Sequence, residues 1–600
     1  MLLNSWWRMS SRFYYLKSAD ELRNNPGQWA AYESKGNSIV IAGPGSGKTK
    51  VLTTKLARIL AEDVREPRSV ACITYSNECA RELERRLSIL GIEQNRRVFI
   101  GTVHSFALVH IIIPYAKTAQ LGLPEDFKVA RESDTKLALE RAFHKTLKRS
   151  DDPQYYMFPM NEYRCSILDR SSSMWANTNQ YLASLSTAYE SELRSMGLID
   201  FTDMPLLALS ALKKNDWLQK AIVAKFPTLI IDEYQDLGLA LHNMVMTLLS
   251  SGIRIFAVGD IDQSIYGFQG AQPAMIDELM STNSVETHRL RLNYRSGASI
   301  VAASTIALEE HRDYESAANE ESLIFFHPHQ GDYKEQAQWL FSSVLPSILS
   351  RLPWINWSDI ALLYPGAWIG NSLATEAAKH GISIVRNDKN AIYPRSSRLL
   401  RWIEHCAEWC CGGWKTGSPR FSQLARQGIT FFIEKLPDKQ TVLFQQKLVS
   451  FLWSSRDSAV SLASWLENFH RDIFSELLAT CSFIHNESEN FQNFFEKCKS
   501  GELKEMSLEQ FAGQGSNQDS LVLTTLHSSK GREFSVVILF GMDEGRIPRP
   551  KPVEKEIIES RRLFYVGFTR AKKEVHIMYT EKNPSRYVTT VKKWIDSSER

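Results

Sequence analysis

The sequence predicts an α/β fold that two long helical segments interrupt. Short apolar runs recur along the chain and end in polar or glycine-rich turns, as the run at 38–41 does before the turn at 42–49. Helical spacing follows several of these runs, which is the alternation expected of parallel α/β folds. Residues 107–199 and 399–515 lack that alternation and are mainly helical in pattern.

Composition places the chain among ordinary globular proteins. Of 600 residues, 43% are apolar and 23% are charged, and the length predicts roughly three to five domains. The net charge of +3 is small, so nucleic-acid binding would have to come from local basic patches. No apolar run approaches the ~18 residues that cross a membrane, and the N-terminus lacks a signal-peptide pattern. Eight scattered cysteines include no C-x-x-C pair, which predicts reduced thiols in a cytoplasmic protein.

Residues 42–49, A-G-P-G-S-G-K-T, match the Walker A phosphate-binding pattern, with Ala42 in place of the usual first glycine. Glycines let successive N–H groups turn toward an anion, while Lys48 reaches the β- and γ-phosphates and Thr49 ligates Mg²⁺. A chance glycine-rich turn is the alternative, but the preceding strand, the loop, the lysine and the threonine all agree. The predicted nucleotide-binding residues of this loop are Ala42, Gly43, Pro44, Gly45, Ser46, Gly47, Lys48 and Thr49.

A second motif places paired carboxylates at the end of another apolar run. Residues 228–236, T-L-I-I-D-E-Y-Q-D, match a Walker B strand, in which Asp232 holds the Mg²⁺ shell and Glu233 orients and deprotonates the attacking water. An acidic turn alone means little, but one that closes a buried strand beside a Walker A loop is specific. Gln28 precedes the first strand, where its amide suits the adenine edge, and Gln263 is placed to sense the γ-phosphate.

Aromatic and polar side chains follow other predicted strands, at the carboxyl edge where open α/β sheets bind ligands. Tyr266 and Phe268 lie just beyond the sensor glutamine and offer ring faces on which bases stack. Their alternative is a place in the core, and their position next to the sensor favours DNA. Thr102 and His104 end another apolar run, and a lone histidine there also fits a structural role.

Further motifs follow the two Walker segments in order. They are G-D-I-D-Q-S-I-Y-G-F-Q-G-A (259–271), R-L-N-Y-R-S (291–296), T-T-L-H-S-S-K-G-R-E-F (524–534) and R-R-L-F-Y-V-G-F-T-R-A (561–571). Together they resemble the UvrD/Rep/PcrA-like helicases of superfamily one. The resemblance covers the chain from Gln28 almost to its end, and so many motifs in the family's order do not arise by chance.

The resemblance implies two RecA-like P-loop cores with ATP in the cleft between them, each interrupted by a mainly helical insertion. The expected domains are 1–106 with 200–291 for the first core, 107–199 for its insertion, 292–398 with 516–600 for the second core, and 399–515 for the second, shortened insertion. The apolar runs expected as second-core strands are 322–327, 359–364, 382–387, 535–540 and 574–579. By motif, Tyr294 would stack on adenine and Glu533 would contact the ribose. Arg295 and Arg570 would reach the γ-phosphate, where charge develops in the transition state.

The same resemblance implies ATP-dependent translocation on single-stranded DNA and unwinding of partly duplex DNA, with 3′→5′ polarity and Mg²⁺ as cofactor. The residues expected to contact DNA are Tyr75, Thr102, His104, Tyr266, Phe268 and His527. Three positions depart from the family pattern. Phe268 replaces a tryptophan, Gln269 replaces an arginine that helps to couple the ATP state to the DNA grip, and Arg532 replaces a leucine.

Two other functions fit the sequence. One is a weakly unwinding regulatory subunit of a nuclease complex that senses ATP or DNA, and the other is a motor on RNA. The shortness of 399–515 suggests a motor that works beside a separately encoded nuclease in DNA repair or antiviral defence. Its aromatic residues Trp402, Trp409, Trp414, Phe431 and Phe432 are then a candidate docking surface, with an ordinary subdomain core as the alternative.

Overall fold

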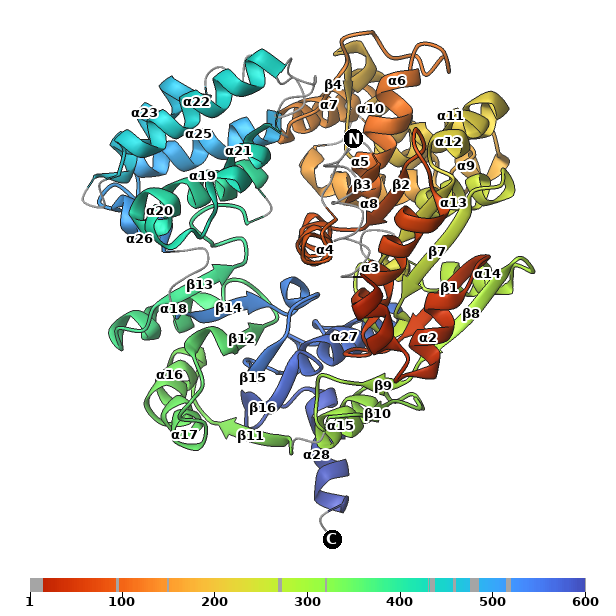
Figure 1. Ribbon diagram of the computed structural model, residues 1–600. Helices are drawn as coiled ribbons and strands as arrows, with labels where there is room; N and C mark the ends of the chain where they lie inside the picture. Colours follow the sequence, from red (N-terminus) through yellow and green to blue (C-terminus); the bar gives the residue numbers. More distant parts are fainter. Residues whose placement is uncertain are drawn as a thin grey trace.

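Two six-stranded parallel sheets lie side by side in the computed structural model, each with helices on both faces (Figure 1). The structure describes residues 15–92, 97–147, 150–267, 272–318, 321–395, 397–429, 431, 438–456, 460–474, 485–513 and 519–598. The predicted α/β fold with two cores is confirmed. The four domain limits stay predictions.

The first sheet has the strand order β3-β2-β6-β7-β1-β8, and all of its neighbouring strands are parallel. Its strands are β1 Asn37–Ala42, β2 Val70–Thr74, β3 Val98–Thr102, β6 Thr228–Ile231, β7 Arg254–Gly259 and β8 Val285–Leu290. Most of these runs are continuously apolar because helices cover both faces of the sheet. All carboxyl ends therefore meet at one edge, where the turn after β1 carries the Walker A sequence.

Helices on the two faces of the first sheet bury separate hydrophobic clusters. The helices of this core are α2 Pro26–Glu33, α3 Lys48–Arg58, α4 Asn77–Ile89, α5 Val103–Ala107, α6 Ile113–Tyr115, α11 Asp203–Lys214, α12 Asp216–Lys225, α13 Leu239–Ser250 and α14 Ala274–Ser281. Ile111 and Ile112 belong to the predicted insertion but pack in the cluster of this core. The insertion therefore continues directly from the core helix α5.

The second sheet has the order β11-β16-β15-β12-β14-β13 and is also parallel throughout. Its strands are β11 Leu323–His329, β12 Ile360–Tyr364, β13 Ile384–Asn387, β14 Leu521–Thr525, β15 Phe534–Leu539 and β16 Ala571–Thr580. Five of them overlap the five predicted runs, whereas β14 lies outside the predicted set. A short pair, β9 Leu292–Asn293 and β10 Glu315–Ser316, lies where the chain enters this core.

Two helical layers cover the second sheet (Figure 1). One layer, on the side of the first core, contains α15 Ala298–Leu308, α27 Glu554–Phe568 and α28 Arg586–Ser598; the other contains α16 Tyr333–Trp339, α17 Leu345–Arg351 and α18 Gly370–Lys379. The helix α27 thereby stands between the second sheet and the first core. Arg570 follows its C-terminus directly, so this helix sets how far that arginine reaches toward the first core.

The first insertion is a helical unit with its own small core. Its elements are α7 Glu132–Thr146, α8 Met157–Ser166, α9 Ser173–Thr178, α10 Gln180–Ser195 and the strand pair β4 Lys128–Val129 with β5 Leu198–Ile199. Arg164 is fully buried and lies 2.6 Å from Asp200 and 2.7 Å from Asp203. Since Asp203 begins the core helix α11, this ion-pair network joins the insertion to the first core.

The second insertion is a bundle of α19 Arg398–Glu408, α20 Trp414–Thr416, α21 Phe421–Ile429, α22 Asp438–Ser454, α23 Leu462–Phe469, α25 His485–Lys499 and α26 Leu508–Ala512. Trp402 and Trp409 are 2% and 6% exposed and belong to its core, where Trp414 and Phe431 also pack. The prediction of a docking surface made of these residues is therefore wrong. Amphipathic helices bury aromatic side chains against one another here. Phe432 lies outside the described residues.

Within the described ranges, none of the helices combines the length and the apolarity that crossing a bilayer requires. Cysteines in that same part of the chain are free thiols.

Truncation of a core tryptophan tests the new assignment of the aromatic cluster. Trp402→Ala should destabilise the second insertion by about 3–5 kcal/mol, because it removes a buried ring and the hydrogen bond from Nε1 to the Leu424 carbonyl. Trp453→Ala, at a residue that is 51% exposed, is the matched control and should cost much less. Native-state hydrogen exchange of the insertion measures both. Equal protection of the amide groups in the two variants would contradict the core position of Trp402.

Candidate functional site

The Walker A loop joins the end of β1 to the start of α3. Gly45 and Gly47 have φ angles of +69° and +83°, a region that favours glycine. A Cβ at Gly47 would lie 2.6 Å from Nε2 of Gln28, and one at Gly45 would lie 2.4 Å from Oδ1 of Asn293. Glycine is thus required at both positions, for backbone angle and for close approach of other parts of the chain.

Gln28 and Tyr294 lie against this loop from two directions. Gln28 is buried, and its Nε2 donates a hydrogen bond of 2.9 Å to the Ser46 carbonyl. The Tyr294 backbone N–H donates to the Gly45 carbonyl at 2.9 Å, and its hydroxyl accepts a hydrogen bond from Asn25. The Tyr294 ring is 47% exposed and lines a cavity beside the loop. The ring is therefore available for a flat ligand next to the loop.

The other predicted loop residues have fixed surroundings as well. Ala42 is the last residue of β1 and is buried. A Cβ at Gly43 would lie 2.6 Å from the ring of Tyr314, which follows the first helix of the second core. Pro44 lines the cavity described next.

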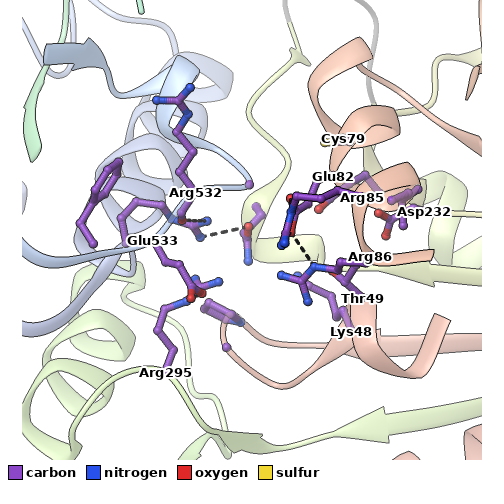
Figure 2. Close-up of a pocket in the computed structure, with 18 residues that line it drawn as sticks. Lys48, Thr49, Cys79, Glu82, Arg85, Arg86, Asp232, Arg295, Arg532 and Glu533 are labelled. Carbon is purple, nitrogen blue, oxygen red and sulfur yellow. Dashed lines mark hydrogen bonds and ion pairs between the residues drawn. The ribbon is translucent and has the colours of Figure 1, made fainter. Parts of the chain in front are cut away.

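Two adjoining cavities of about 440 Å³ and about 620 Å³ lie between the cores. Figure 2 shows Lys48 and Thr49 on one side of the first cavity, with Arg295 and Glu533 across from them. Residues that line both cavities are Gly45, Lys48, Thr49, Arg86, Arg295 and Glu533. The Walker A loop therefore faces side chains of the second core across one continuous space.

A chain of polar contacts links the Walker A lysine to the second core. Lys48 Nζ lies 3.0 Å from Oδ2 of Asp260, which also accepts a hydrogen bond of 2.5 Å from Nε2 of Gln263. Arg570 donates to Oε1 of Gln263 at 3.2 Å. Burial, with the nearby Arg295 charge, lowers the pKa of Arg570 to about 9. Asp260 and Gln263 thus connect Lys48 to Arg570 of the second core.

The predicted carboxylate pair lies at the end of β6. Glu233 has a left-handed backbone, with φ +54° and ψ 47°, a strained conformation that costs about 1–3 kcal/mol and persists at sites that hold it in place. Burial and the neighbouring Glu233 raise the pKa of Asp232 to about 7. Burial acts to raise the pKa of Glu233 too, but Lys530, Lys48 and a hydrogen bond outweigh it and hold that pKa at about 2. Glu233 is therefore a carboxylate at neutral pH.

Lys530 crosses from the second core into the first. Its Nζ lies 2.6 Å from Oδ2 of Asp236, 2.7 Å from the Gln263 carbonyl and 3.6 Å from Glu233. The side chains of Lys530 and Asp236 are 4% and 2% exposed. Asp236 and Glu233 outweigh the effect of burial and raise the pKa of Lys530. Burial raises the pKa of Asp236 to about 7 although Lys530 acts to lower it, so the pair is only partly ionised at neutral pH. A buried lysine–aspartate contact therefore bridges the two cores.

Arg295 and Glu533 pair with each other on the second-core wall. Arg295 Nε donates to Oε2 of Glu533 at 2.8 Å, and Lys572 lies 2.9 Å from the same carboxylate. Burial acts to raise the pKa of Glu533, but these two cations hold it at about 2. Arg295 is thus at the cavity, although the pairing differs from its predicted contact with phosphate.

Aromatic rings form a row across the two cores. Tyr75 lies 5.3 Å from Tyr266 and 6.4 Å from His104, and Tyr266 lies 6.5 Å from His527 of the second core, measured between ring centroids. Phe201 stacks on His104 at 4.0 Å and is 60% exposed. Burial lowers the pKa of both His104 and His527 to about 4, so both rings are neutral at pH 7. The row offers uncharged stacking surfaces.

Thr102, also predicted to contact DNA, lies outside the aromatic row. Thr102 is the N-cap of α5, and its hydroxyl accepts a hydrogen bond of 3.1 Å from the Ser105 backbone N–H. Its side chain is buried, which makes it a support for His104 two residues later. Phe268 lies outside the described residues.

Comparison with known families decides between the classes that fit this geometry. Residues 24–283 match the model of the UvrD/REP helicase N-terminal domain, and residues 445–582 match the UvrD-like helicase C-terminal domain. The chain belongs to the UvrD/Rep-like helicase family. The predicted resemblance and the predicted enzyme class, an ATP-dependent DNA helicase, are confirmed.

Relatives of this helicase align over most of its length. It is 28% identical to the ATP-dependent DNA helicase Rep of Escherichia coli (strain K12), over 92% of this chain and 90% of that protein. It is 24% identical to DNA helicase II of the same strain, over 93% and 84% of the two chains. DNA helicase II of Rickettsia typhi is 25% identical over 95% of both.

Sequence reasoning missed several residues of this helicase. Asp260 follows β7 directly and Lys530 stands in the T-T-L-H-S-S-K-G motif. The position of each residue in the sequence could therefore have identified it as a site residue. Phe201 follows the short strand β5, and nothing in its local pattern separates it from a core aromatic. Glu82 pairs with Arg85 at 2.8 Å and with Arg86 at 2.6 Å, so α4 adds a charged wall to the first cavity.

Removal of the predicted general base tests the site. Glu233→Gln keeps the size of the side chain but cannot take a proton, so turnover at saturating ATP and single-stranded DNA should fall at least ~10²-fold. Binding of a fluorescent ATP analogue should stay within a few-fold of the unmodified protein, since the Walker A loop is untouched. Wild-type turnover by this variant would assign the base to another residue.

Proposed function

We propose that this helicase is a single-stranded DNA translocase that unwinds duplex DNA in the 3′→5′ direction and is driven by ATP hydrolysis. The observation that carries the proposal is the shared cavity between the cores. It combines Lys48 and Glu233 of the first core with Arg295 and Arg570 of the second. The aromatic row crosses the same two cores, so one relative movement of the cores acts on both ligands.

ATP binding follows from the groups around the Walker A loop. The backbone N–H groups of the glycine turn and Lys48 Nζ would receive the phosphates. Tyr294, which lines the second cavity, and Gln28, which is buried against the Ser46 carbonyl of the loop, would hold the adenine. Tyr294 supplies a ring face for stacking and Gln28 an amide that reads a base edge. The nucleotide thus contacts the first core and the entry to the second.

The residues present also suit Mg²⁺. The Thr49 hydroxyl and the Asp232 carboxylate both line the first cavity, and hard oxygen donors are what this ion prefers. When bound, Mg²⁺ would neutralise charge on the β- and γ-phosphates. Glu233 lies next to Asp232 and stays ionised, so it is placed to orient a water and accept its proton.

Hydrolysis is coupled to DNA through one short loop. The γ-phosphate competes with Asp260 for Lys48, and Asp260 is also the partner of Gln263. Gln263 in turn holds Arg570 of the second core, so a change at the phosphate reaches both cores. Tyr266 follows Gln263 by three residues and belongs to the aromatic row. The same loop therefore meets the nucleotide at one end and DNA bases at the other.

DNA binding by the row would be tolerant of sequence. Every base has a π-face, and stacking on an aromatic side chain contributes about 1–3 kcal/mol per base. The neutral state of His104 and His527 fits stacking better than charge attraction. Salt-dependent phosphate contacts would come from local basic side chains, since the net charge is only +3.

The cellular setting stays a proposal. A cytoplasmic motor that works beside a separately encoded nuclease in repair or antiviral defence agrees with the short second insertion. The tryptophans of that insertion are buried in its core, so they do not support the idea of a docking surface for a nuclease. Lys48, Glu233 and Arg570 at the cavity argue against a subunit that cannot hydrolyse ATP, but they do not separate a strong motor from a weakly unwinding regulatory subunit.

Strand polarity gives the direct test of this function. ATP turnover should rise at least tenfold when single-stranded DNA is added, and a duplex with a 3′ single-stranded tail should be unwound in preference to one with a 5′ tail. Single-stranded RNA of the same sequence is the matched control and should stimulate turnover less. DNA-independent turnover, or equal unwinding of the two tailed duplexes, would contradict the proposal.

A further inference from the structure

Tyr314 is an aromatic residue of the second core that lies against the Walker A loop. It stands in the connection between α15 and β10 and is partly buried. A Cβ at Gly43 would lie 2.6 Å from Cε1 of its ring, so the ring packs directly on the backbone of the loop. Tyr314 is not one of the residues that bind ATP in the proposed function, yet it contacts the segment that does.

The hydroxyl of Tyr314 contacts the loop after β7. It donates a hydrogen bond of 3.1 Å to Oδ2 of Asp262, whose side chain is 2% exposed. Burial, with the charges of Asp260 and Asp262, raises the pKa of Tyr314, so the hydroxyl keeps its proton and stays a donor. The Asp262 backbone N–H donates to Oδ1 of Asp260 at 3.1 Å, and Asp260 is the partner of Lys48. One side chain therefore contacts the Walker A loop with its ring and the neighbouring sensor loop with its hydroxyl.

Arg312 holds the same carboxylate from the second core. Its Nε donates to Oδ2 of Asp262 at 2.8 Å, and its Nη2 donates to Oδ1 at 2.7 Å. Two parallel hydrogen bonds from a guanidinium fix the direction of a carboxylate as well as its distance. Asp262 therefore offers Tyr314 an acceptor whose position is set before any nucleotide binds.

The strand pair β9–β10 brings a second contact to the same loop. The two strands are parallel neighbours, and Asn293 ends β9. A Cβ at Gly45 would lie 2.4 Å from Oδ1 of Asn293, and the residue before β10, Tyr314, covers Gly43 in the same way. The entry to the second core therefore packs against the Walker A loop at two alternate residues, where a side chain on the loop would have no room.

We propose that Tyr314 is a positioning residue for ATP, which holds the first half of the Walker A loop in the shape that receives the phosphates. A loop that is ordered before binding loses less entropy when the nucleotide arrives. Because Tyr314 belongs to the second core, the affinity for ATP then depends on how that core lies against the first. This inference rests on the proposed function, because it takes the Walker A loop as the ATP site.

Steady-state kinetics of ATP turnover at saturating single-stranded DNA test this role. The constants kcat and KM for ATP are measured for the unmodified full chain and three variants. Tyr314→Leu keeps apolar bulk but loses the flat ring and the hydroxyl, whereas Tyr314→Phe loses only the hydrogen bond to Asp262. Asp313→Ala is the matched control, since Asp313 is adjacent in the chain and pairs at the surface with Arg291 at 2.8 Å.

Tyr314→Leu should raise KM roughly tenfold and keep kcat within about twofold, because ATP binding weakens while the groups that act on bound ATP are untouched. Tyr314→Phe should raise KM only about two- to threefold, as expected for one lost hydrogen bond, and this rise decides the proposal if Tyr314→Leu does not fold. Asp313→Ala should leave both constants unchanged.

Three results would overturn the inference while leaving the proposed function intact. They are an unchanged KM in either Tyr314 variant, equal KM values in the two variants, and a fall in kcat as large as the expected rise in KM. Absence of ATP turnover by the unmodified chain would instead contradict the proposed function.

Discussion

The buried charge contacts between the two cores are the constraint on which the rest of the structure depends. Lys530 of the second core lies among Asp236 and Glu233 of the first, and Arg570 reaches Lys48 through Gln263 and Asp260. A buried charge that loses its partner is costly, by about 3–5 kcal/mol for a broken pair. The relative position of the cores is therefore tied to the charge in the cleft. In the proposed function ATP brings several negative charges into that cleft, so we expect its binding and hydrolysis to change how the cores fit together.

The parallel sheets explain why this constraint also reaches DNA. In each sheet all strands end at one edge, so the loops after β2, β3, β7 and β14 bring Tyr75, His104, Tyr266 and His527 into a single row. The loop after β7 carries both Gln263 and Tyr266. In the proposed function, a change at Gln263 that depends on the phosphate reaches Tyr266, the proposed stacking ring, after only three residues. The two insertions lie outside this path, with cores of their own.

Local sequence patterns predicted the site residues whose roles depend only on nearby residues of the chain. The Walker A turn and the carboxylates after β6 occur where a strand must end, so their positions followed from the local sequence pattern. Arg570 was found through the resemblance of its motif to the family. Lys530 and Asp260 gain their roles only when the two cores meet. The role of Phe201 depends on whether its ring faces solvent, which its local sequence does not show. The docking surface at Trp402 was wrong for the same reason, because an aromatic-rich helix does not reveal which face its neighbours cover. The strand β14 was missed because its short apolar run leads directly into a motif.

The central claim is that the second core completes the hydrolytic site of the first. Single-turnover hydrolysis of ATP by Arg570→Ala, with the protein in excess over ATP and with saturating single-stranded DNA, tests it most directly. The account predicts a rate at least ~10³-fold below that of the unmodified protein, as for loss of an arginine finger. ATP binding should be largely kept. The matched variant is Arg561→Ala, since Arg561 lies on α27 and pairs with Glu309 away from the cleft. Turnover by Arg570→Ala within tenfold of the unmodified protein would contradict the claim.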